Sequence, residues 1–317
     1  MQDHYARNIT YLRISLTDRC NLRCRYCMPE EGINKLCHSD VLRFEEILEI
    51  TAACASLGIK KVRLTGGEPL IRRGCISLCR EIAALPGIEE LAMTTNGLLL
   101  PDYARELKEA GLQRVNISLD TLSPEKFRHI TGGGSLERVL EGIKAAIDAD
   151  LTPVKLNTVL IGGFNDDEIP ALAAMTREYP VDLRFIELMP MGPGAEFDER
   201  AFLSGQAVLD ALPELTPEAE DGGVARLYRL PGAKGRIGLI SPLSNHFCGS
   251  CNRLRLTSEG ALKPCLHSNQ EIPLRGLHGE ALKNQILSAI AAKPQQHGLL
   301  DAHHSSEAGR AMNTIGG

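Results

Sequence analysis

The sequence predicts an α/β fold in which parallel strands curl into most of a barrel, and two observations support this prediction. Over the first 200 of the 317 residues, strand-like runs alternate with helix-like runs, with six strands in all. Several motifs with unusual chemistry directly follow these strands, as in TIM-type barrel enzymes. Right-handed crossovers would therefore give a partial (β/α)6 barrel. A doubly wound open sheet is the competing architecture, although the first crossover lacks the G-x-G-x-x-G motif of dinucleotide-binding sheets.

The first strand is predicted at residues 11–17, where Leu12, Ile14 and Leu16 alternate with polar residues such as Arg13. Five further strands are predicted at residues 61–65, 90–95, 114–119, 153–160 and 182–188. Helices are predicted between them, at residues 43–57, about 74–85, 101–110, 135–149 and 167–178. Barrel enzymes place their chemistry at the C-terminal ends of the strands, so we expect one site assembled from successive loops.

The alternating pattern stops near residue 192. Residues 192–233 are rich in glycine, proline and acidic residues, and they are predicted to form a connection with one short helix at about 206–212. A strand is predicted next at residues 236–240, followed by a hairpin with strands at 254–257 and 261–265. We therefore expect two parts. Residues 1–200 form the partial barrel, and residues 201–317 form a C-terminal region that completes the barrel opening.

Composition sets limits on the class of protein. Hydrophobic residues make up 43% of the chain and the mean hydropathy is -0.10, as in ordinary globular proteins with a sizeable core. A net charge of -5 gives no general attraction to nucleic acid or anionic membranes, so an anionic ligand needs a local group of basic residues. The sequence suggests no signal peptide and no apolar run near the ~20 residues of a membrane span. Ten cysteines then favour metal binding in a reducing cytoplasm.

The first cysteine set, Cys20, Cys24 and Cys27, has C-x3-C-x2-C spacing and directly follows the first predicted strand. Thiolates this close together can bind one metal centre, but structural zinc sites and electron-carrying clusters normally take four protein ligands. A [4Fe–4S] cluster with three cysteine ligands keeps one iron open for chemistry. The alternative is a structural zinc loop, for which His38 is the nearest fourth ligand.

The second cysteine set, Cys248, Cys251 and Cys265, has C-x2-C-x13-C spacing within the predicted hairpin. A second cluster with an open iron is one interpretation. A Cys3His zinc site is the other, because His246 or His267 could supply the fourth ligand.

The hairpin register predicts which side chains share a face with this second set. If Thr257 pairs with Ala261 across the turn, then Arg255 faces Lys263 and Arg253 faces the last cysteine. Two guanidinium groups would then lie beside the thiols. This arrangement indicates a bound anion or a polar planar ligand, because the guanidinium group offers bidentate donors.

The first cysteine spacing, with Tyr26 before its last cysteine, resembles the radical S-adenosylmethionine (SAM) superfamily. Nearly the whole chain resembles the GTP 3′,8-cyclase family within it, which serves molybdenum cofactor biosynthesis. The shared motifs are LRIS at residues 12–15, GGEP at 66–69, NDDE at 165–168, RFIELMP at 184–190, both cysteine sets and the terminal Gly316-Gly317.

The resemblance implies two [4Fe–4S] clusters with different tasks. The cluster on the first cysteine set would reduce SAM, which splits into methionine and a 5′-deoxyadenosyl radical. The cluster on the second set would hold the guanine of GTP. The radical would abstract the ribose C3′ hydrogen, and the resulting carbon radical would attack C8, giving (8S)-3′,8-cyclo-7,8-dihydroguanosine 5′-triphosphate.

The resemblance also assigns residues and partners. The residues implied around SAM are Tyr26, Gly67, Ser118 and Met189. The residues implied around GTP are Arg13, Arg63, Thr94, Lys155, Arg184, Arg253 and Arg255. An external one-electron reductant of the flavodoxin or ferredoxin type is expected, with cyclic pyranopterin monophosphate synthase as the next enzyme and a homodimer as an option. The terminal Gly316-Gly317 would reach into the active site.

Three other functions compete with this one: a radical SAM peptide maturase with an auxiliary cluster, a two-cluster electron-transfer protein, and a zinc-stabilised nucleotide-binding module. Three cysteines in each set disfavour the first two, which usually carry more. The remaining cysteines match no family motif; they are Cys37, Cys54, Cys75 and Cys79, of which the last three are expected in the core. The chain departs from the family at Ala6 and Asp150, where glycine is common.

Overall fold

The computed structural model describes residues 1–29, 32, 36–219 and 222–315, and it confirms the predicted α/β partial barrel. The six predicted strands are present as β1 (Tyr11–Ser15), β2 (Lys61–Thr65), β3 (Glu90–Thr95), β4 (Arg114–Ser118), β5 (Val154–Leu160) and β6 (Val181–Glu187). They lie side by side in chain order, and each pairs with the next in parallel.

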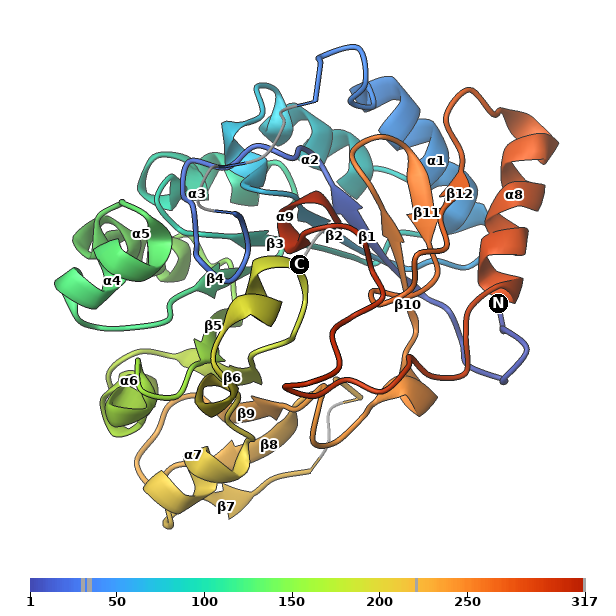
Figure 1. Ribbon diagram of the computed structural model, residues 1–317. Helices are drawn as coiled ribbons and strands as arrows, with labels where there is room; N and C mark the ends of the chain where they lie inside the picture. The colour runs from blue at the N-terminus through green and yellow to red at the C-terminus, as the bar shows by residue number, and fades with distance from the viewer. Residues whose placement is uncertain (30–31, 33–35, 220–221, 316–317) are drawn as a thin grey trace.

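Helices on the outer side of the curved sheet connect these strands (Figure 1). They are α1 (Phe44–Ser56), α2 (Cys75–Ala83), α3 (Leu100–Glu109), α4 (Pro124–Thr131), α5 (Leu136–Asp148) and α6 (Ile169–Glu178). The sequence analysis missed α4 and treated its residues as a loop. Its start carries a recognisable signal, since the Ser123 hydroxyl accepts a hydrogen bond from the Lys126 amide and Pro124 is the first helical residue.

The C-terminal region extends the same sheet at both edges. Its elements are α7 (Gln206–Ala211), β7 (Thr216–Pro217), β8 (Arg226–Arg229), β9 (Ile237–Ile240), β10 (Arg253–Leu256), β11 (Ala261–Lys263), β12 (Ile272–Pro273), α8 (Gly279–Ala291) and α9 (Met312–Ile315). Strand β9 pairs in parallel with β6, and β10 pairs in parallel with β1. The parallel part therefore has one strand more at each edge than the six predicted.

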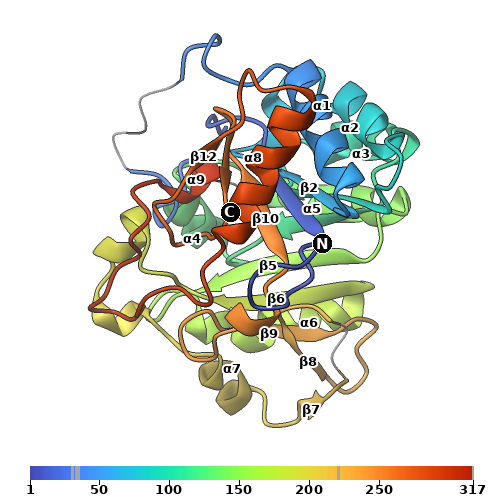
Figure 2. The ribbon, with the colours of Figure 1, turned by 90° about the vertical axis from the view of Figure 1, so that its right-hand side faces the viewer.

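The sheet stays open in the described part of the chain, because β9 continues to β8 and β10 continues to β11 instead of pairing with each other. Residues 241–252 connect β9 to β10 and so link the two edges of the parallel part. Figure 2 shows α8 beside β12 and next to α1, and α8 also contacts β11. In Figure 1, α9 lies inside the curve of the sheet, where it contacts β1.

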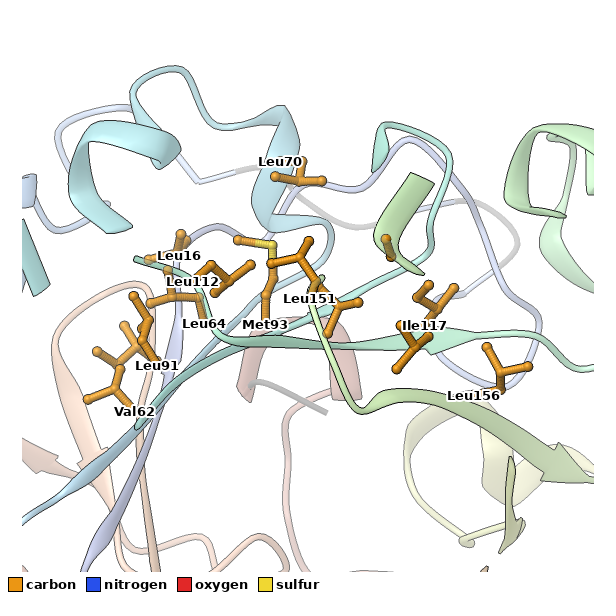
Figure 3. Close-up of a cluster of buried hydrophobic side chains, with 14 of the residues drawn as sticks. Leu16, Val62, Leu64, Leu70, Leu91, Met93, Leu112, Ile117, Leu151 and Leu156 are labelled. Atoms are coloured by element: carbon orange, nitrogen blue, oxygen red, sulfur yellow. The ribbon is translucent and has the colours of Figure 1, made fainter. Parts of the chain in front are cut away.

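The hydrophobic core lies between the strands and the outer helices. Leu12, Ile14 and Leu16 are fully buried there, as the alternation in the first strand predicts. Figure 3 shows the same layer farther along the sheet, where Leu64 and Met93 point away from the concave side toward the helices. The concave side is left for other side chains. Cys54, Cys75 and Cys79 are buried in this core, as expected, whereas Cys37 is exposed. Within the described residues, no helix is long and apolar enough to cross a membrane.

The hairpin register is also confirmed. Arg255 pairs with Lys263 across β10 and β11, and the Thr257 amide donates to the Ala261 carbonyl at 2.8 Å. This register places Arg253 and Arg255 on one face of β10.

The two departures from the family pattern have a conformational meaning. Ala6 and Asp150 are the only described residues other than glycine with positive φ, at 59° and 56°. This left-handed region costs an ordinary residue about 1–2 kcal/mol, whereas glycine adopts it freely and Asp tolerates it. Asp150 also has compensating contacts, since its carboxylate accepts hydrogen bonds from Lys108 Nζ at 2.8 Å and from the Thr152 hydroxyl at 2.9 Å.

We expect Ala6→Gly to raise the free energy of unfolding by about 1 kcal/mol, because it removes strain that no side-chain contact offsets. The midpoint of thermal unfolding, followed by circular dichroism, should rise by about 2 °C. Asp150→Gly is the matched control and should change stability by less than about 0.5 kcal/mol, since the strain relief and the lost contacts nearly cancel. A lower midpoint for Ala6→Gly would contradict this account.

Candidate active site

A cavity of about 530 Å³ opens on the concave side of the sheet, within the range of sites for small-molecule ligands. Its wall contains residues from β1 to β6, from β10 and from the loops that follow these strands. Every site residue predicted from the sequence lines this one cavity; these are Cys20, Cys24, Cys27, Cys248, Cys251, Cys265, Tyr26, Gly67, Ser118, Met189, Arg13, Arg63, Thr94, Lys155, Arg184, Arg253 and Arg255. The structure therefore brings together two cysteine sets that are more than 200 residues apart in the sequence.

The loop that carries the first cysteine set is held by the end of helix α4. The backbone amides of Arg23 and Arg25 donate to the carbonyls of Thr131 and Ile130, at 2.7 and 2.9 Å. The amide of Cys27 donates to the carbonyl of Cys24 at 2.9 Å, which makes a tight turn between these two cysteines. The helix that the sequence analysis missed is thus one support of the first cysteine loop.

The glycine pair after β2 fits against the start of the same loop. A Cβ atom on Gly67 would lie 2.1 Å from the carbonyl oxygen of Arg19, and one on Gly66 would lie 2.6 Å from that of Thr17. The Gly67 amide donates to the Thr17 carbonyl at 2.8 Å, and the Glu68 amide to the Arg19 carbonyl at 2.9 Å. Only glycine allows this close approach, so the GGEP motif after β2 holds the start of the cysteine loop in place.

A buried carboxylate then joins the β2 loop to the next strand. Glu68 accepts hydrogen bonds from the Thr95 hydroxyl and the Asn96 amide, both at 2.8 Å, and from the Leu70 amide at 3.1 Å. Burial raises the pKa of Glu68 to about 7, although these hydrogen bonds act in the opposite direction. The Asn96 side chain in turn donates to Asn21 Oδ1 at 2.7 Å, which reaches the cysteine loop again.

Two further carboxylates, at the ends of β4 and β6, also accept hydrogen bonds from the loops around the cavity. Asp120 accepts a hydrogen bond from the Tyr26 hydroxyl at 2.8 Å, and burial raises the pKa of Asp120 to about 6. Glu187 accepts from the backbone amides of Leu243 and Ser244 at 2.9 and 3.0 Å. Acidic groups at the ends of β2, β4 and β6 thus hold the loops in place around the cavity.

The two cysteine sets lie in electrostatically different surroundings. Burial raises the pKa of Cys24 well above its usual value and that of Cys27 to about 12, and neighbouring thiolates add to both effects. Burial would also raise the pKa of Cys251, but Lys293 and Arg253 outweigh it, so that the pKa of Cys251 is lowered. The first set is therefore in apolar and acidic surroundings, and the second is in basic ones.

The donor set of the first loop fits a [4Fe–4S] cluster better than a single ion. Its three thiols are partly exposed on the cavity wall, so they could hold a cluster that keeps one iron open for chemistry. Among the described residues, no three His, Cys, Asp or Glu side chains surround one point as a lone metal ion requires. At the second set, His267 Nδ1 is hydrogen-bonded to the Ser306 hydroxyl at 3.0 Å. This bond leaves Nε2 of His267 available to a metal, so it does not distinguish a Cys3His zinc site from a cluster at the second set.

A row of arginines crosses the concave face. Arg255 on β10, Arg13 on β1 and Arg63 on β2 are direct neighbours in the parallel register. Burial, together with the charge of neighbouring arginines, lowers the pKa of Arg13 well below its usual value and that of Arg255 to about 10. Burial likewise lowers the pKa of Arg63. Like charges in neighbouring strand positions repel each other, so this face is suited to an anion.

Several polar atoms of this face lack a protein partner. Among the described residues, Arg63 Nε, Arg253 Nε and Thr94 Oγ1 are buried without a hydrogen bond. Leaving a buried donor or acceptor unsatisfied costs about 1–3 kcal/mol. Lys155 and Arg184 line the same cavity from β5 and β6. The wall is thus arranged to donate hydrogen bonds to a ligand rich in acceptor atoms.

Sequence reasoning missed some lining residues that it could have found. Tyr11, Asn116 and Asn157 line the cavity two positions away from predicted site residues on the same strands. Period-2 alternation alone places them on the concave face. The Tyr11 ring also lies under the Arg63 guanidinium, whose central carbon is 5.4 Å from the ring centroid. Lys293 lines the cavity as well, but no local pattern marks it.

The predicted role of Gly316-Gly317 falls outside the described residues. Helix α9 just before them is part of the site, because Asn313 Nδ2 donates to the Asp18 carbonyl at 3.0 Å beside the first cysteine loop. Arg255 on the hairpin of the second set reaches the Ile315 carbonyl at 3.5 Å. Helix α9 therefore contacts both parts of the site.

Comparisons with known proteins agree with this architecture. A model of the radical SAM superfamily matches residues 14–176, and a model named Molybdenum Cofactor Synthesis C matches residues 181–299. The crystal structure of Streptococcus suis SuiB bound to S-adenosylmethionine superposes with a TM-score of 0.61 at 15% identity, over 97% of this chain and 77% of that one. Native anSMEcpe with bound AdoMet superposes with a TM-score of 0.58 at 15% identity, over 92% and 82%. These two structures share the fold.

Sequence relatives match the whole chain. The GTP 3′,8-cyclase of Alkaliphilus oremlandii is 53% identical over 100% of both chains. That of Peptoclostridium acidaminophilum is 54% identical over 99% of this chain and 98% of the relative. With matches of this length and identity, the chain belongs to the radical SAM superfamily and, within it, to the GTP 3′,8-cyclase family.

Proposed function

We propose that the protein is a radical SAM GTP 3′,8-cyclase that acts in molybdenum cofactor biosynthesis. The main support for this proposal is that one cavity is lined by both cysteine sets and by the arginine row. The full-length relatives that bear this name support it. They do not favour a peptide maturase or a two-cluster electron-transfer protein.

Membership of the superfamily supports SAM and a [4Fe–4S] cluster as the cofactors. Cys20, Cys24 and Cys27 would hold this cluster, which when bound supplies the electron that splits SAM. Tyr26, Gly67, Ser118 and Met189 would bind SAM beside it. The hydrogen bond from Tyr26 to Asp120 supports this role for Tyr26, because it holds the aromatic ring at the cavity wall.

The basic face of the cavity would bind GTP. A triphosphate carries about four negative charges, and a net acidic protein needs a focused group of cations to bind it. The arginine row would bind the phosphates, because an anion relieves the repulsion between the side chains of Arg255, Arg13 and Arg63. The other residues in contact with GTP would be Thr94, Lys155, Arg184 and Arg253.

The C-terminal region, residues 201–317, would complete the site with a second [4Fe–4S] cluster on Cys248, Cys251 and Cys265. Its open iron would hold the guanine. Transfer of the ribose C3′ hydrogen atom to the 5′-deoxyadenosyl radical would leave a carbon radical that adds to C8. The nitrogen-centred radical formed by this addition would then take up one electron from the external donor and one proton to give the dihydro product. These steps would require the nucleotide to keep its two ends fixed, one at the arginines and one at the hairpin. Residues 1–200 would supply the SAM half of the site.

Partners follow from this chemistry. An external one-electron donor of the flavodoxin or ferredoxin type would reduce the first cluster, and cyclic pyranopterin monophosphate synthase would consume the product. We further propose a cytoplasmic location, which suits ten cysteines that are all free. A homodimer is compatible with the proposal and would show by light scattering.

Anaerobic reconstitution should give about eight irons per chain with matching sulfide, from two [4Fe–4S] clusters. A Cys24→Ser variant should lose about half of this iron and all SAM cleavage. Cys251→Ser should lose the other half of the iron. Its main loss of activity should be in cyclisation, because the SAM-binding part of the site stays intact. Iron, sulfide and zinc analysis with a visible spectrum measures this, and zinc at the second set would refute the guanine-binding role.

Reduced protein given SAM and GTP should form 5′-deoxyadenosine and the cyclised nucleotide in equal amounts. Liquid chromatography with mass spectrometry detects both. ATP in place of GTP is the control, because its purine edge has a different donor pattern at the position proposed to face the second cluster. Equal 5′-deoxyadenosine formation with ATP would refute the substrate assignment.

Replacing Arg63 with Met should have opposite effects on stability and on binding. Removal of one charge from the arginine row should stabilise the ligand-free protein, since Arg63 is buried and its Nε has no partner. GTP affinity, measured by anaerobic titration calorimetry, should fall about 10- to 100-fold with the loss of charged hydrogen bonds. Arg200→Met, an exposed position far from the cavity lining, is the control. Unchanged GTP affinity for Arg63→Met would contradict the proposed binding face.

A further inference from the structure

Lys293 is a buried lysine that lies two residues after the end of helix α8. The residue is 3% exposed, in a cavity wall beside the second cysteine set. Lysine is almost never fully buried without partners, because its ammonium group is expensive to remove from water. The contacts of this ammonium group therefore indicate why it is there.

Its Nζ atom joins the two limbs of the cysteine hairpin. It donates to the Arg253 carbonyl at 2.9 Å and to the Pro264 carbonyl at 2.7 Å. Arg253 lies two residues after Cys251, and Pro264 lies one residue before Cys265. One ammonium group thus fixes the backbone next to two of the three cysteines.

The third cysteine is tied to the same segment by an arginine. Arg7 Nη1 donates to the Cys248 carbonyl at 2.9 Å and to the Gln295 carbonyl at 3.0 Å, and Nη2 donates to the Pro294 carbonyl at 2.7 Å. Lys293 thus holds the backbone beside Cys251 and Cys265, and Arg7 links the backbone of Cys248 to Pro294 and Gln295. The segment 293–295 is the common support of the second set.

Charge adds to this positional argument. Three thiolates carry negative charge, and a cluster bound by them gains one more on reduction. A cation within hydrogen-bonding distance favours the more negative state, most strongly where water is excluded. Hydrogen bonds and charges around the sulfur atoms are known determinants of cluster potential.

We infer that Lys293 is a positioning residue for the second cysteine set, which holds the hairpin limbs at cluster-binding separation and raises the reduction potential of the cluster bound there. The inference rests on the proposed second cluster. It deepens that proposal by adding a residue outside the cysteines and the GTP-binding face.

The test uses the full-length chain with Cys20, Cys24 and Cys27 all changed to Ser, so that only the second set can load. After anaerobic reconstitution this background should hold about four irons. If it holds none, the second cluster itself is refuted, which is a different result from any change at Lys293.

Three substitutions in this background separate position from charge. Lys293→Met removes all donors and should retain less than half of the iron. Lys293→Gln keeps a donor without the charge; at a fixed potential its ratio of reduced to oxidised cluster should fall at least tenfold, which is about 59 mV in midpoint. Lys293→Arg should restore both properties. Lys283→Met, on helix α8 and paired with Glu280 at 3.0 Å, is the control.

Iron analysis and redox titration followed by electron paramagnetic resonance give the readouts. Full iron in Lys293→Met would overturn the positioning role, and an unchanged midpoint in Lys293→Gln would overturn the role of charge. Circular dichroism checks folding. If Lys293→Met does not fold, the Gln and Arg variants decide: a lower midpoint or lost iron in Gln with rescue in Arg supports the inference, and wild-type behaviour of both overturns it.

Discussion

Burying like charges side by side is the constraint on which the rest of this structure depends. Arg255, Arg13 and Arg63 occupy neighbouring positions on three parallel strands and lower one another's affinity for protons. Such a row destabilises a sheet unless the remaining structure holds it. The apolar layer on the opposite face does so, because Leu12 and Ile14 on β1 are fully buried against the outer helices. Alternation in one strand thus supplies both the core and the binding face.

Acidic groups at the ends of alternate strands hold the loops around the cavity. Glu68, Asp120 and Glu187 accept hydrogen bonds from backbone amides and hydroxyl groups of the loops. These hydrogen bonds make the loops rigid. A site that must hold two ligands in contact needs this rigidity, because small errors in position cost large factors in rate.

A structural feature could be predicted from the sequence where the residues that determine it lie close together in the chain. The bounds of β2 and β3 agree to the residue, because alternation and flanking turns lie within each segment. The placement of β9 beside β6 and of β10 beside β1 could not be predicted, since it depends on pairing across the chain. The same holds for site residues. Spacing marks the cysteines, whereas Lys293 and Arg7 act through contacts with remote carbonyl groups and carry no sequence pattern of their own.

Contacts between segments remote in the sequence hold the second cysteine set in position. The hairpin pairs with β1, Arg7 reaches it from the N-terminus, and Lys293 reaches it from the end of α8. Helix α9 then contacts both the first cysteine loop and Arg255. Every one of these contacts joins segments far apart in the sequence, so the loop-closure entropy must be overcome by the packing of the whole sheet. The first cysteine loop is held by α4 and by the loops after β2 and β3, and α9 contacts it as well. The hydrogen bonds around the second set need both edges of the sheet and segments near both ends of the chain, which couples the assembly of this part of the site to completion of the fold.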